Sequence, residues 1–340
     1  MKKFTFIFLF GFLSLQVSAQ KSDVTDLFRE QKPLDLKLKV SIKDIKKKTN
    51  DSTFLPAALY SKTEAGNWDS IKINVRARGI FRRKNCYFSP IRIKISKSDA
   101  KGTFLEGNKS LKLVMPCQNN DGKNPLVMKE FVCYKMYEKI SPYYFNTRLA
   151  NLDFTEADGK KNKNFQLISF FIEDDNLVAK RHHAKVMENL NLHPLGLNDT
   201  AALRHDFFQL MVANTDWSTT YLHNAKVIFQ EPKKYIPLTY DFDMSGFVNP
   251  PYAEVSPELG IANVRERLYR GFCRKEPVTQ FVRKEYLALE PTILGVVDSY
   301  QKDFSPRDFK DMKEYLGEFF GILKNDSQFK SMILDGCRKK

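Results

Sequence analysis

The chain has 340 residues, 42% of them hydrophobic and 28 of them Phe, which is enough to bury a large core over two domains or two lobes. That content excludes a chain too polar to fold. Lys and Arg number 55 against 40 Asp and Glu, for a formal net charge of +15. A basic chain favours acidic surfaces or phosphate-bearing ligands, although solubility alone also accounts for such a charge.

Residues 1–19 have the pattern of a signal peptide. Lys2 and Lys3 come first, an apolar run follows from 4 to 15, and small residues ending in Ala19 come before Gln20. The apolar run is too short to anchor the chain in a bilayer, and no later segment is apolar enough to do so. We therefore expect an exported protein, periplasmic or secreted after cleavage near Ala19, with no integral membrane span.

The chain has five cysteines, which is an odd number for a protein of an oxidising compartment. No spacing among them matches a zinc site. Cys86 and Cys117 flank two predicted strands that should pair, so we predict a disulfide between them ahead of any other pairing. The five are Cys86, Cys117, Cys133, Cys273 and Cys337.

Alternating apolar residues predict four strands in the first half of the chain. Between the first and second of them, the basic run 46–48 and the polar residues as far as Thr53 predict a loop. The four strands are expected over 34–42, 71–77, 91–95 and 111–115.

A turn with four cations, residues 78–84, follows the second strand. The chain has neither a Gly-rich nucleotide loop nor a Walker A sequence. Any phosphate bound here would therefore be held by the side chains of this turn, beginning with Arg78, and by the Gly79 backbone. Lys94 and Lys112 lie in the next two strands. Lys112 has apolar neighbours on both sides, and a solvent-facing position is the alternative for either lysine.

Residues 126–140 have helical periodicity. Glu130 shares a face of this helix with Val127, Tyr134 and Tyr137. A carboxylate on a mostly apolar face needs a partner, which can be a lysine or a neighbouring tyrosine hydroxyl.

Residues 148–154 and 165–172 predict an antiparallel hairpin, and its second strand runs directly into Glu173. Without other information, Glu173 and the two acids after it indicate a turn. A basic helix is expected over 178–193.

A further helix, capped by Asp199 or Thr200, is expected to lead to Asp216, because its apolar residues fall on one face. After Gly246 the sequence predicts a loop, followed by helical stretches that are interrupted at Pro306.

Two loops near the middle of the chain carry the residues that phosphoryl transfer uses. That reaction needs a carboxylate that accepts the proton of the attacking hydroxyl, and an amide and a second carboxylate that hold magnesium. Asp216, Asn224 and Asp241 supply this set in chain order. Val227 and Phe229 alternate between them, so a short strand should bring both loops to one end of a sheet. Taken singly, Asn and Asp are also ordinary turn formers.

The residues around Asp216 and His223-Asn224, followed by Tyr240-Asp241-Phe242-Asp243, resemble the catalytic and metal-binding segments of atypical kinases. The resemblance is to the HipA type and, more closely, to the spore-coat CotH type, which also has the paired Asp-x-Asp. In protein kinases the Asn follows the Asp at the fifth position, whereas Asn224 follows Asp216 at the eighth. The three extra residues either bulge harmlessly or displace the metal ligand.

The resemblance to the CotH type implies an α+β, two-lobed protein-kinase-like fold. A strand-rich nucleotide-type lobe would span 71–173 and a mainly helical catalytic-type lobe 174–340, after an N-terminal extension over 20–70. The resemblance also implies Mg²⁺ and ATP as cofactors, and a protein hydroxyl as the phosphoryl acceptor.

The resemblance further implies a role for each candidate site residue. Asp216 would be the base, and the metal ligands would be Asn224, Asp241 and Asp243. The residues that would contact the nucleotide are Lys112 paired with Glu130, Lys94 as the alternative lysine, Arg78 at the phosphates and Glu173 at the hinge that meets adenine.

Two other functions fit the same residues. A catalytically silent binding or assembly protein of the cell envelope fits the long loop after Asp216, the missing glycine loop and the scarcity of ATP outside the cytoplasm. A metal-assisted hydrolase built on Asp216, Asp241 and Asp243 also fits, since clustered carboxylates bind magnesium. The expected partner is a protein substrate or an envelope component, and not nucleic acid.

Overall fold

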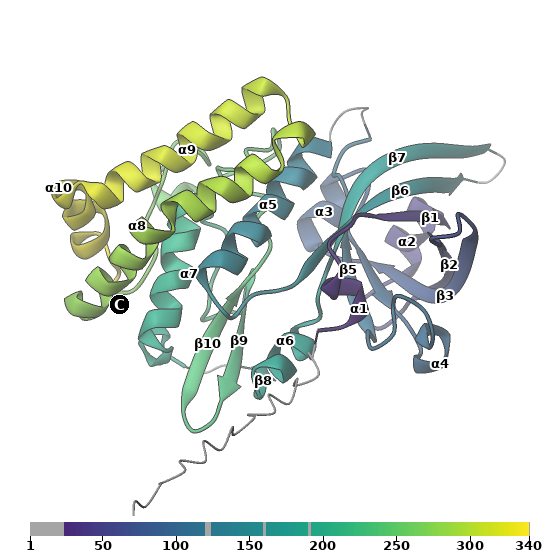
Figure 1. Cartoon of the computed structure of the whole chain (residues 1–340), viewed down its shortest axis with the longest axis horizontal. Coiled ribbons are helices and arrows are strands. Elements are labelled where there is room, and N and C mark those ends of the chain that lie inside the picture. Colours follow the sequence, from purple (N-terminus) through teal and green to yellow (C-terminus); the bar gives the residue numbers. More distant parts are fainter. Residues whose placement is uncertain (1–23, 120–123, 159–160, 190–191, 340) are drawn as a thin grey trace, which may run out of the picture.

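The computed structural model describes residues 24–119, 124–158, 161–189 and 192–339. The predicted signal peptide lies outside these residues. The chain forms two halves that lie side by side, a barrel of strands and a mainly helical half that also contains a small sheet (Figure 1).

Seven strands form the closed barrel, in the order β1-β2-β3-β4-β5-β7-β6. Neighbouring strands are antiparallel except at the closure, where β1 pairs in parallel with β6 from Leu34 opposite Ala150 to Val40 opposite Glu156. The strands are β1 (Leu34–Val40), β2 (Leu55–Lys62), β3 (Trp68–Ala77), β4 (Ile91–Lys94), β5 (Ser110–Val114), β6 (Thr147–Asp158) and β7 (Lys161–Ile172).

Apolar side chains at every second position of the strands fill the barrel interior. Leu36 and Leu38 of β1 and Ile71, Ile73 and Val75 of β3 are all buried in one apolar cluster, because every second side chain of a strand points to the same face. Short helices belong to this half: α1 (Asp26–Arg29), α2 (Ile42–Lys48), α3 (Ile80–Asn85) and α4 (Lys97–Ala100).

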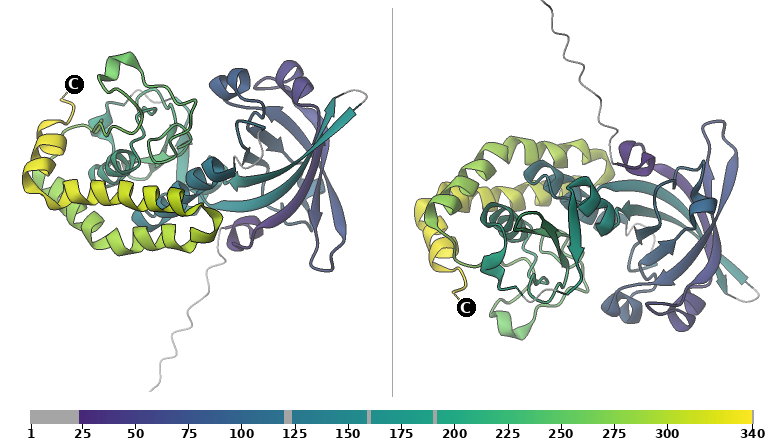
Figure 2. Two further views of the ribbon diagram at one scale, coloured as in Figure 1. Left: turned by 90° about the horizontal axis from the view of Figure 1, so that it is seen from above. Right: turned by 90° about the horizontal axis from the view of Figure 1, so that it is seen from below.

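The second half packs its helices around a separate core, with α8 and α9 side by side on its outer surface (Figure 2). A three-stranded antiparallel sheet of order β10-β9-β8 lies beneath α7. The elements are α5 (Asn124–Ile140), α6 (Asp175–Arg181), β8 (Ala184–Met187), α7 (Asp199–Met211), β9 (Ala225–Gln230), β10 (Lys234–Thr239), α8 (Glu276–Ser299), α9 (Pro306–Lys324) and α10 (Asp326–Phe329).

Strand β7 belongs to both cores. Phe171 lies in the barrel interior, whereas Phe170 and Ile172 lie in the core of the helical half. Phe170 packs edge-on against Phe131 and Tyr134 of α5, with ring centroids 5.5 and 5.6 Å away. The last residues of β7, which are apolar on both faces, therefore join the halves by packing into both cores.

The expectation of a two-lobed protein-kinase-like fold is wrong. The parallel pairing of β1 with β6 closes the strands into a seven-stranded barrel. Residues 20–70, which were expected to form an N-terminal extension with a first strand, contain β1 and β2 of that barrel. The alternation of single strands can be seen in the sequence, whereas this long-range pairing cannot.

Several local predictions are confirmed, among them the strands now numbered β1, β3, β4 and β5, the hairpin of β6 and β7, and helix α5. The basic helix expected over 178–193 is wrong, since α6 ends at Arg181 and β8 begins at Ala184. Helix α7 is capped by Asn198, whose side chain accepts a hydrogen bond from Ala201 N, and not by Asp199 or Thr200. Of the loop expected over 46–53, residues 46–48 belong to helix α2, whereas 49–53 lie outside any helix or strand.

The predicted disulfide between Cys86 and Cys117 is confirmed. A second disulfide joins Cys273 to Cys337, and Cys133 is a buried free thiol. The first bridge lies directly after α3, and the second ties the last residues of the chain to the loop before α8. At both bridges, backbone hydrogen bonds join the same segments, from Tyr87 N to Cys117 O and from Cys273 N to Arg338 O.

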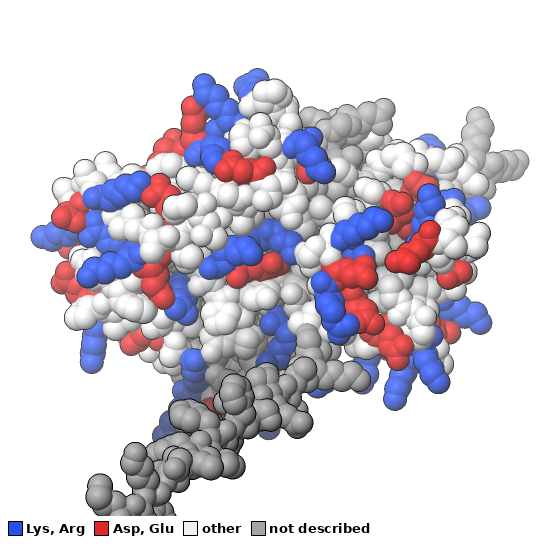
Figure 3. Space-filling view, in the orientation of Figure 1, with Lys and Arg blue, Asp and Glu red and all other residues white. Residues whose placement is uncertain are grey.

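Within the described ranges, none of the helices is long and apolar enough to cross a membrane. On the face drawn in Figure 3, basic and acidic side chains are interspersed over both halves. The excess of positive charge is therefore not gathered into one patch on that face.

Replacing Phe170 with Ala is expected to destabilise the protein by about 3–5 kcal/mol, because it empties ring volume where the two cores meet. Urea unfolding would measure the change. Phe281→Ala on α8 is the matched control, because that ring is 51% exposed and its loss should change stability by no more than about 0.5 kcal/mol. Equal effects of the two substitutions would contradict the packing described for β7.

Candidate functional site

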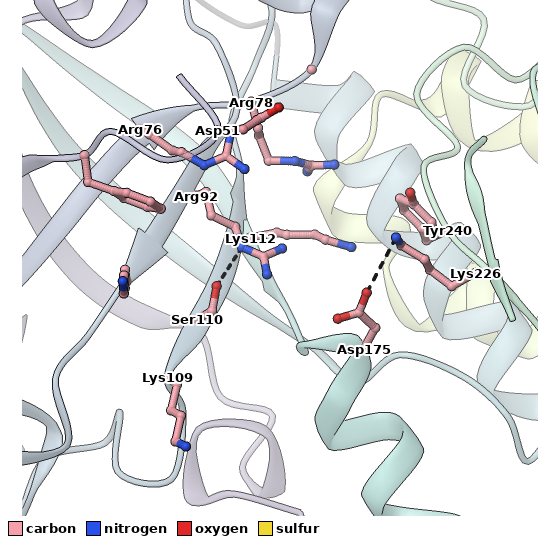
Figure 4. Close-up of a pocket in the computed structure, with 13 residues that line it drawn as sticks. Asp51, Arg76, Arg78, Arg92, Lys109, Ser110, Lys112, Asp175, Lys226 and Tyr240 are labelled. Carbon is pink, nitrogen blue, oxygen red and sulfur yellow. Dashed lines mark hydrogen bonds and ion pairs between the residues drawn. The ribbon is translucent and has the colours of Figure 1, made fainter. Parts of the chain in front are cut away.

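A cavity of about 570 Å³ lies between the barrel and the helical half (Figure 4). Strands β3, β4 and β5 form one wall, and the start of α6, strand β9 and the residue after β10 form the other. Seven of its lining side chains are Lys or Arg and two are carboxylates. They are Arg76, Arg78, Arg92, Lys94, Lys109, Lys112 and Lys226, with Asp51 and Asp175.

Strand register explains why the cations gather. Arg76 of β3 lies opposite Arg92 of β4, and Arg92 lies opposite Lys112 of β5. All three side chains therefore point to the outer face of the barrel in one row. Like charges directly opposite on neighbouring strands are destabilising, so this row costs stability unless an anion offsets it.

Two members of the row are paired with acids. Arg76 contacts Asp51 at 2.8 Å, and Arg92 contacts Asp174 at 2.8 Å. The third, Lys112, is 5% exposed, and its Nζ has no hydrogen-bond partner among the described residues. Burial, together with the charge of Arg78, lowers the pKa of Lys112 from 10.5 to about 7.

Aromatic rings line the path of the Lys112 side chain. Its Nζ lies 4.1 Å from the ring centroid of Tyr240 and 5.1 Å from that of Phe145. In Figure 4, Lys112 and Arg78 both extend from the barrel wall toward Tyr240. The amine is therefore held at the junction of the two halves by ring faces and not by a counter-ion.

Beside the cavity, Arg82 of α3 binds two acids from the other half. Its Nε donates to Asp243 Oδ2 at 2.6 Å and its Nη2 to Glu130 Oε2 at 3.2 Å. Burial opposes the charge of Arg82, but Asp243 and Glu130 outweigh it and raise its pKa. The guanidinium therefore remains charged although the residue is 8% exposed.

The acids around Arg82 differ in charge state. Burial raises the pKa of Glu130 to about 8 and that of Asp243 to about 6, against the opposing effect of Arg82 on each. Burial also acts to raise the pKa of Asp241, but Arg78, 3.6 Å away, and Arg82 hold it below its usual value. At neutral pH Asp241 is therefore ionised and Asp243 is mostly ionised, whereas Glu130 is mostly protonated.

The three extra residues between Asp216 and Asn224 form an outward bulge and do not separate the two side chains. Ser218 and His223 exchange two backbone hydrogen bonds of 2.8 and 2.9 Å, which close the intervening residues into a small turn. Tyr221 at this turn is 86% exposed. Asn224 Nδ2 still reaches Asp216 Oδ2 at 3.0 Å, so the insertion bulges outward and leaves the two residues together.

The Asp216 and Asp241 loops are joined by Asn214. Its Oδ1 accepts a hydrogen bond from Asp216 N at 3.1 Å, and its Nδ2 donates to the Asp241 carbonyl at 3.4 Å. Asn224 and Asp241 both have positive φ, 45° and 68°. Non-glycine residues seldom adopt this conformation, and where they do, it often marks a functional site.

The candidate residues thus fall into three groups. Arg78, Lys94 and Lys112 line the cavity. Asp241, Asp243 and Glu130 lie beside Arg78 and Arg82, so the partner of Glu130 is Arg82 and not Lys112. Asp216 and Asn224 form the third group, joined to Asp241 through Asn214.

Glu173 belongs to none of these groups. It is 1% exposed, and its carboxylate is held by Arg181 at 2.9 Å and by the Asn146 side chain at 2.9 Å. Asp175, two residues later, lines the cavity in its place. A role for the Glu173 backbone at a hinge stays a prediction.

The residues present do not fit a divalent cation. Within the described ranges, no group of three or more His, Cys, Asp or Glu side chains converges in a way that could hold a metal. Asp243 and Glu130 already bind Arg82, Asp241 faces Arg78, and Asn224 presents its amide nitrogen to Asp216. Positive side chains of the protein therefore occupy the carboxylates that were expected to bind Mg²⁺.

From the sequence, Arg82 was expected to contact phosphate together with the other side chains of the turn 78–84, and its pairing with Glu130 and Asp243 was not foreseen. Arg92, Asp175, Lys226 and Tyr240 were also missed as cavity residues. The placement of Arg92 opposite Lys112 could have been proposed from sequence, since both lie in consecutive alternating strands. Asp175 and Lys226 face the barrel only through tertiary packing, which no local pattern reveals.

Comparison with known proteins adds no family to this picture. No model of a protein family matches the chain, and none of the curated proteins matches it significantly. The function is therefore inferred from the geometry of the cavity and its surroundings.

Lys112→Met is expected to stabilise the protein most near pH 7. In the folded chain the pKa of Lys112 is about 7 and not 10.5, so between these values the unfolded chain binds the extra proton. Stability of the wild type should therefore rise with pH in this window relative to the variant, by about 1 kcal/mol per pH unit.

Urea unfolding of both chains at several pH values between 7 and 10 would measure this difference. Lys72→Met, on the exposed part of β3, is the control and should show no such slope. A difference between wild type and Lys112→Met that is the same at every pH would contradict a desolvated amine.

Proposed function

We propose that this chain binds a phosphate-bearing ligand such as ATP in the cationic cavity, and transfers a phosphoryl group from it to a protein hydroxyl. The observation that carries the proposal is the row of Arg76, Arg92 and Lys112 across three strands, with Lys112 buried and without a hydrogen-bond partner among the described residues. Phosphate oxygens are the ligand groups that such a row recognises best.

In this proposal each group has a separate task. Lys112 and Arg78 contact the phosphates and stabilise the charge that develops on them. The Asp216 carboxylate takes the proton of the acceptor hydroxyl, whose oxygen forms a bond to phosphorus. The bond from phosphorus to the bridging oxygen breaks, and the remaining nucleotide leaves with that electron pair. Asn224 and His223 orient Asp216.

The accessibility of Asp216 supports this assignment. Its side chain is 52% exposed, no Lys or Arg forms an ion pair with it in the described structure, and His223 Nε2 lies 2.8 Å from its Oδ1. A base needs access to its substrate and freedom from a permanent cation. The Asn214 bridge keeps this carboxylate beside the Asp241 loop.

The resemblance of these loops to the CotH type remains part of the proposal, and it concerns the motif residues and not the architecture. Export to the periplasm or outside the cell is likewise proposed, and the two disulfides support it, because such bridges persist in oxidising compartments. The acceptor would then be an envelope or secreted protein.

The second candidate is a binding or assembly protein of the envelope without catalysis. It is favoured by one observation, the binding of Arg82 to both Glu130 and Asp243, which withdraws one expected metal ligand, Asp243, and the expected partner of Lys112, Glu130. Ligand binding would then be the whole function of the cavity.

Arg78→Gln is expected to weaken the binding of inorganic pyrophosphate by about tenfold, because a charged hydrogen bond to phosphate is lost. Isothermal titration calorimetry would measure the affinity. Lys72→Gln removes the same net charge from an exposed position on β3 and should leave binding unchanged. If both variants lose affinity equally, binding depends on overall charge and the cavity is not the site.

Asp216→Asn is expected to reduce phosphoryl transfer by about a hundredfold or more while leaving nucleotide binding nearly unchanged, because a base acts mainly in the transition state. Transfer of label from radioactive ATP to the protein itself or to envelope extract would be compared between variants. Asp69→Asn, on an exposed carboxylate of β3, is the control. Nucleotide binding without any labelling in the wild type would favour the second candidate.

A further inference from the structure

The positively charged guanidinium of Arg82 lies beside Glu130 and Asp243, where a divalent cation was expected. The guanidinium lies between Glu130 of α5 and Asp243 after β10, at 3.2 and 2.5 Å from their oxygens. Its side chain is 9% exposed, and those of Glu130 and Asp243 are 3% and 10% exposed. A metal ion would have to displace a buried cation from both partners at once.

Contacts between helix α3 and the barrel restrict movement of Arg82 away from Glu130 and Asp243. The neighbouring Arg83 donates to the carbonyls of Lys46 and Thr49, and the helix is followed at once by the Cys86–Cys117 disulfide. Both contacts tie α3 to the barrel. The position of Arg82 is therefore built into the covalent and hydrogen-bonded structure of this segment.

The cavity has enough positive charge to receive an anion that brings no cation with it. Seven Lys and Arg side chains line it against two carboxylates. One of them, Arg78, lies 3.6 Å from Asp241, whose charge also acts on Arg82. A nucleotide that is already neutralised by Mg²⁺ would bring less negative charge to these groups. Coulomb attraction favours the free anion over its magnesium complex.

We propose that Arg82 serves in place of a divalent cation, so that the cavity binds its phosphate-bearing ligand as a metal-free anion. This inference rests on the proposed function, since it concerns the ligand of the same cavity. It assigns to Arg82 the charge neutralisation that Mg²⁺ provides elsewhere.

The test is calorimetric titration of the mature chain with inorganic pyrophosphate and with ATP, once in EDTA and once in excess Mg²⁺. The expected result is binding in EDTA that is at least as tight as in Mg²⁺. Binding that requires Mg²⁺ would overturn the inference and leave the proposed function in place. Absence of binding under both conditions would overturn the proposed function itself.

Variants of Arg82 sharpen the test. Arg82→Gln should lose tenfold or more of its affinity for pyrophosphate in EDTA and recover part of it in Mg²⁺, because Glu130 and Asp243 are then free to bind the metal. Lys84→Gln, an exposed residue of the same helix α3, is the matched control and should bind as the wild type does in both buffers. A variant at Arg82 with wild-type affinity in EDTA would overturn the inference, and the wild-type comparison alone decides it if that variant fails to fold.

Discussion

The buried contact of Arg82 with Glu130 and Asp243 is the interaction on which the arrangement of the two halves depends. Arg82 belongs to the barrel half, and its partners lie 48 and 161 positions away in the other half. Removing one member of such a group leaves a buried charge without compensation, which typically costs about 3–5 kcal/mol. Apolar packing through Phe170 joins the halves without directional preference, whereas the ion pairs fix α3 against the Asp241 loop.

The fold around this contact could be predicted only in part. Alternation in 34–40, 71–77 and 111–114 specified strands, and the helix over 126–140 followed from its periodicity. The closure of the barrel could not be foreseen, because the parallel pairing of β1 with β6 joins segments more than a hundred residues apart. The resemblance of a short motif to kinases then suggested an architecture that this pairing contradicts.

The candidate site was predictable to a similar degree. Asp216, Asn224 and Asp241 stand out in the sequence by chemistry and order, and the structure does bring their loops together through Asn214. The partner of Glu130 was not predictable, because periodicity shows that a carboxylate lies on an apolar face but not which cation reaches it. Arg82 reaches it from a turn that looked like one basic segment among several.

Positive charge at the cavity explains why its parts are arranged in this way. Arg76, Arg92 and Lys112 repel one another across β3, β4 and β5, and the chain offsets this repulsion in a different way for each. Arg76 and Arg92 have carboxylate partners, whereas Lys112 is buried and its pKa falls to about 7. An anion that enters the cavity would favour the charged form of Lys112. The repulsion among the three cations is therefore unfavourable in the free protein, and ligand binding reduces it.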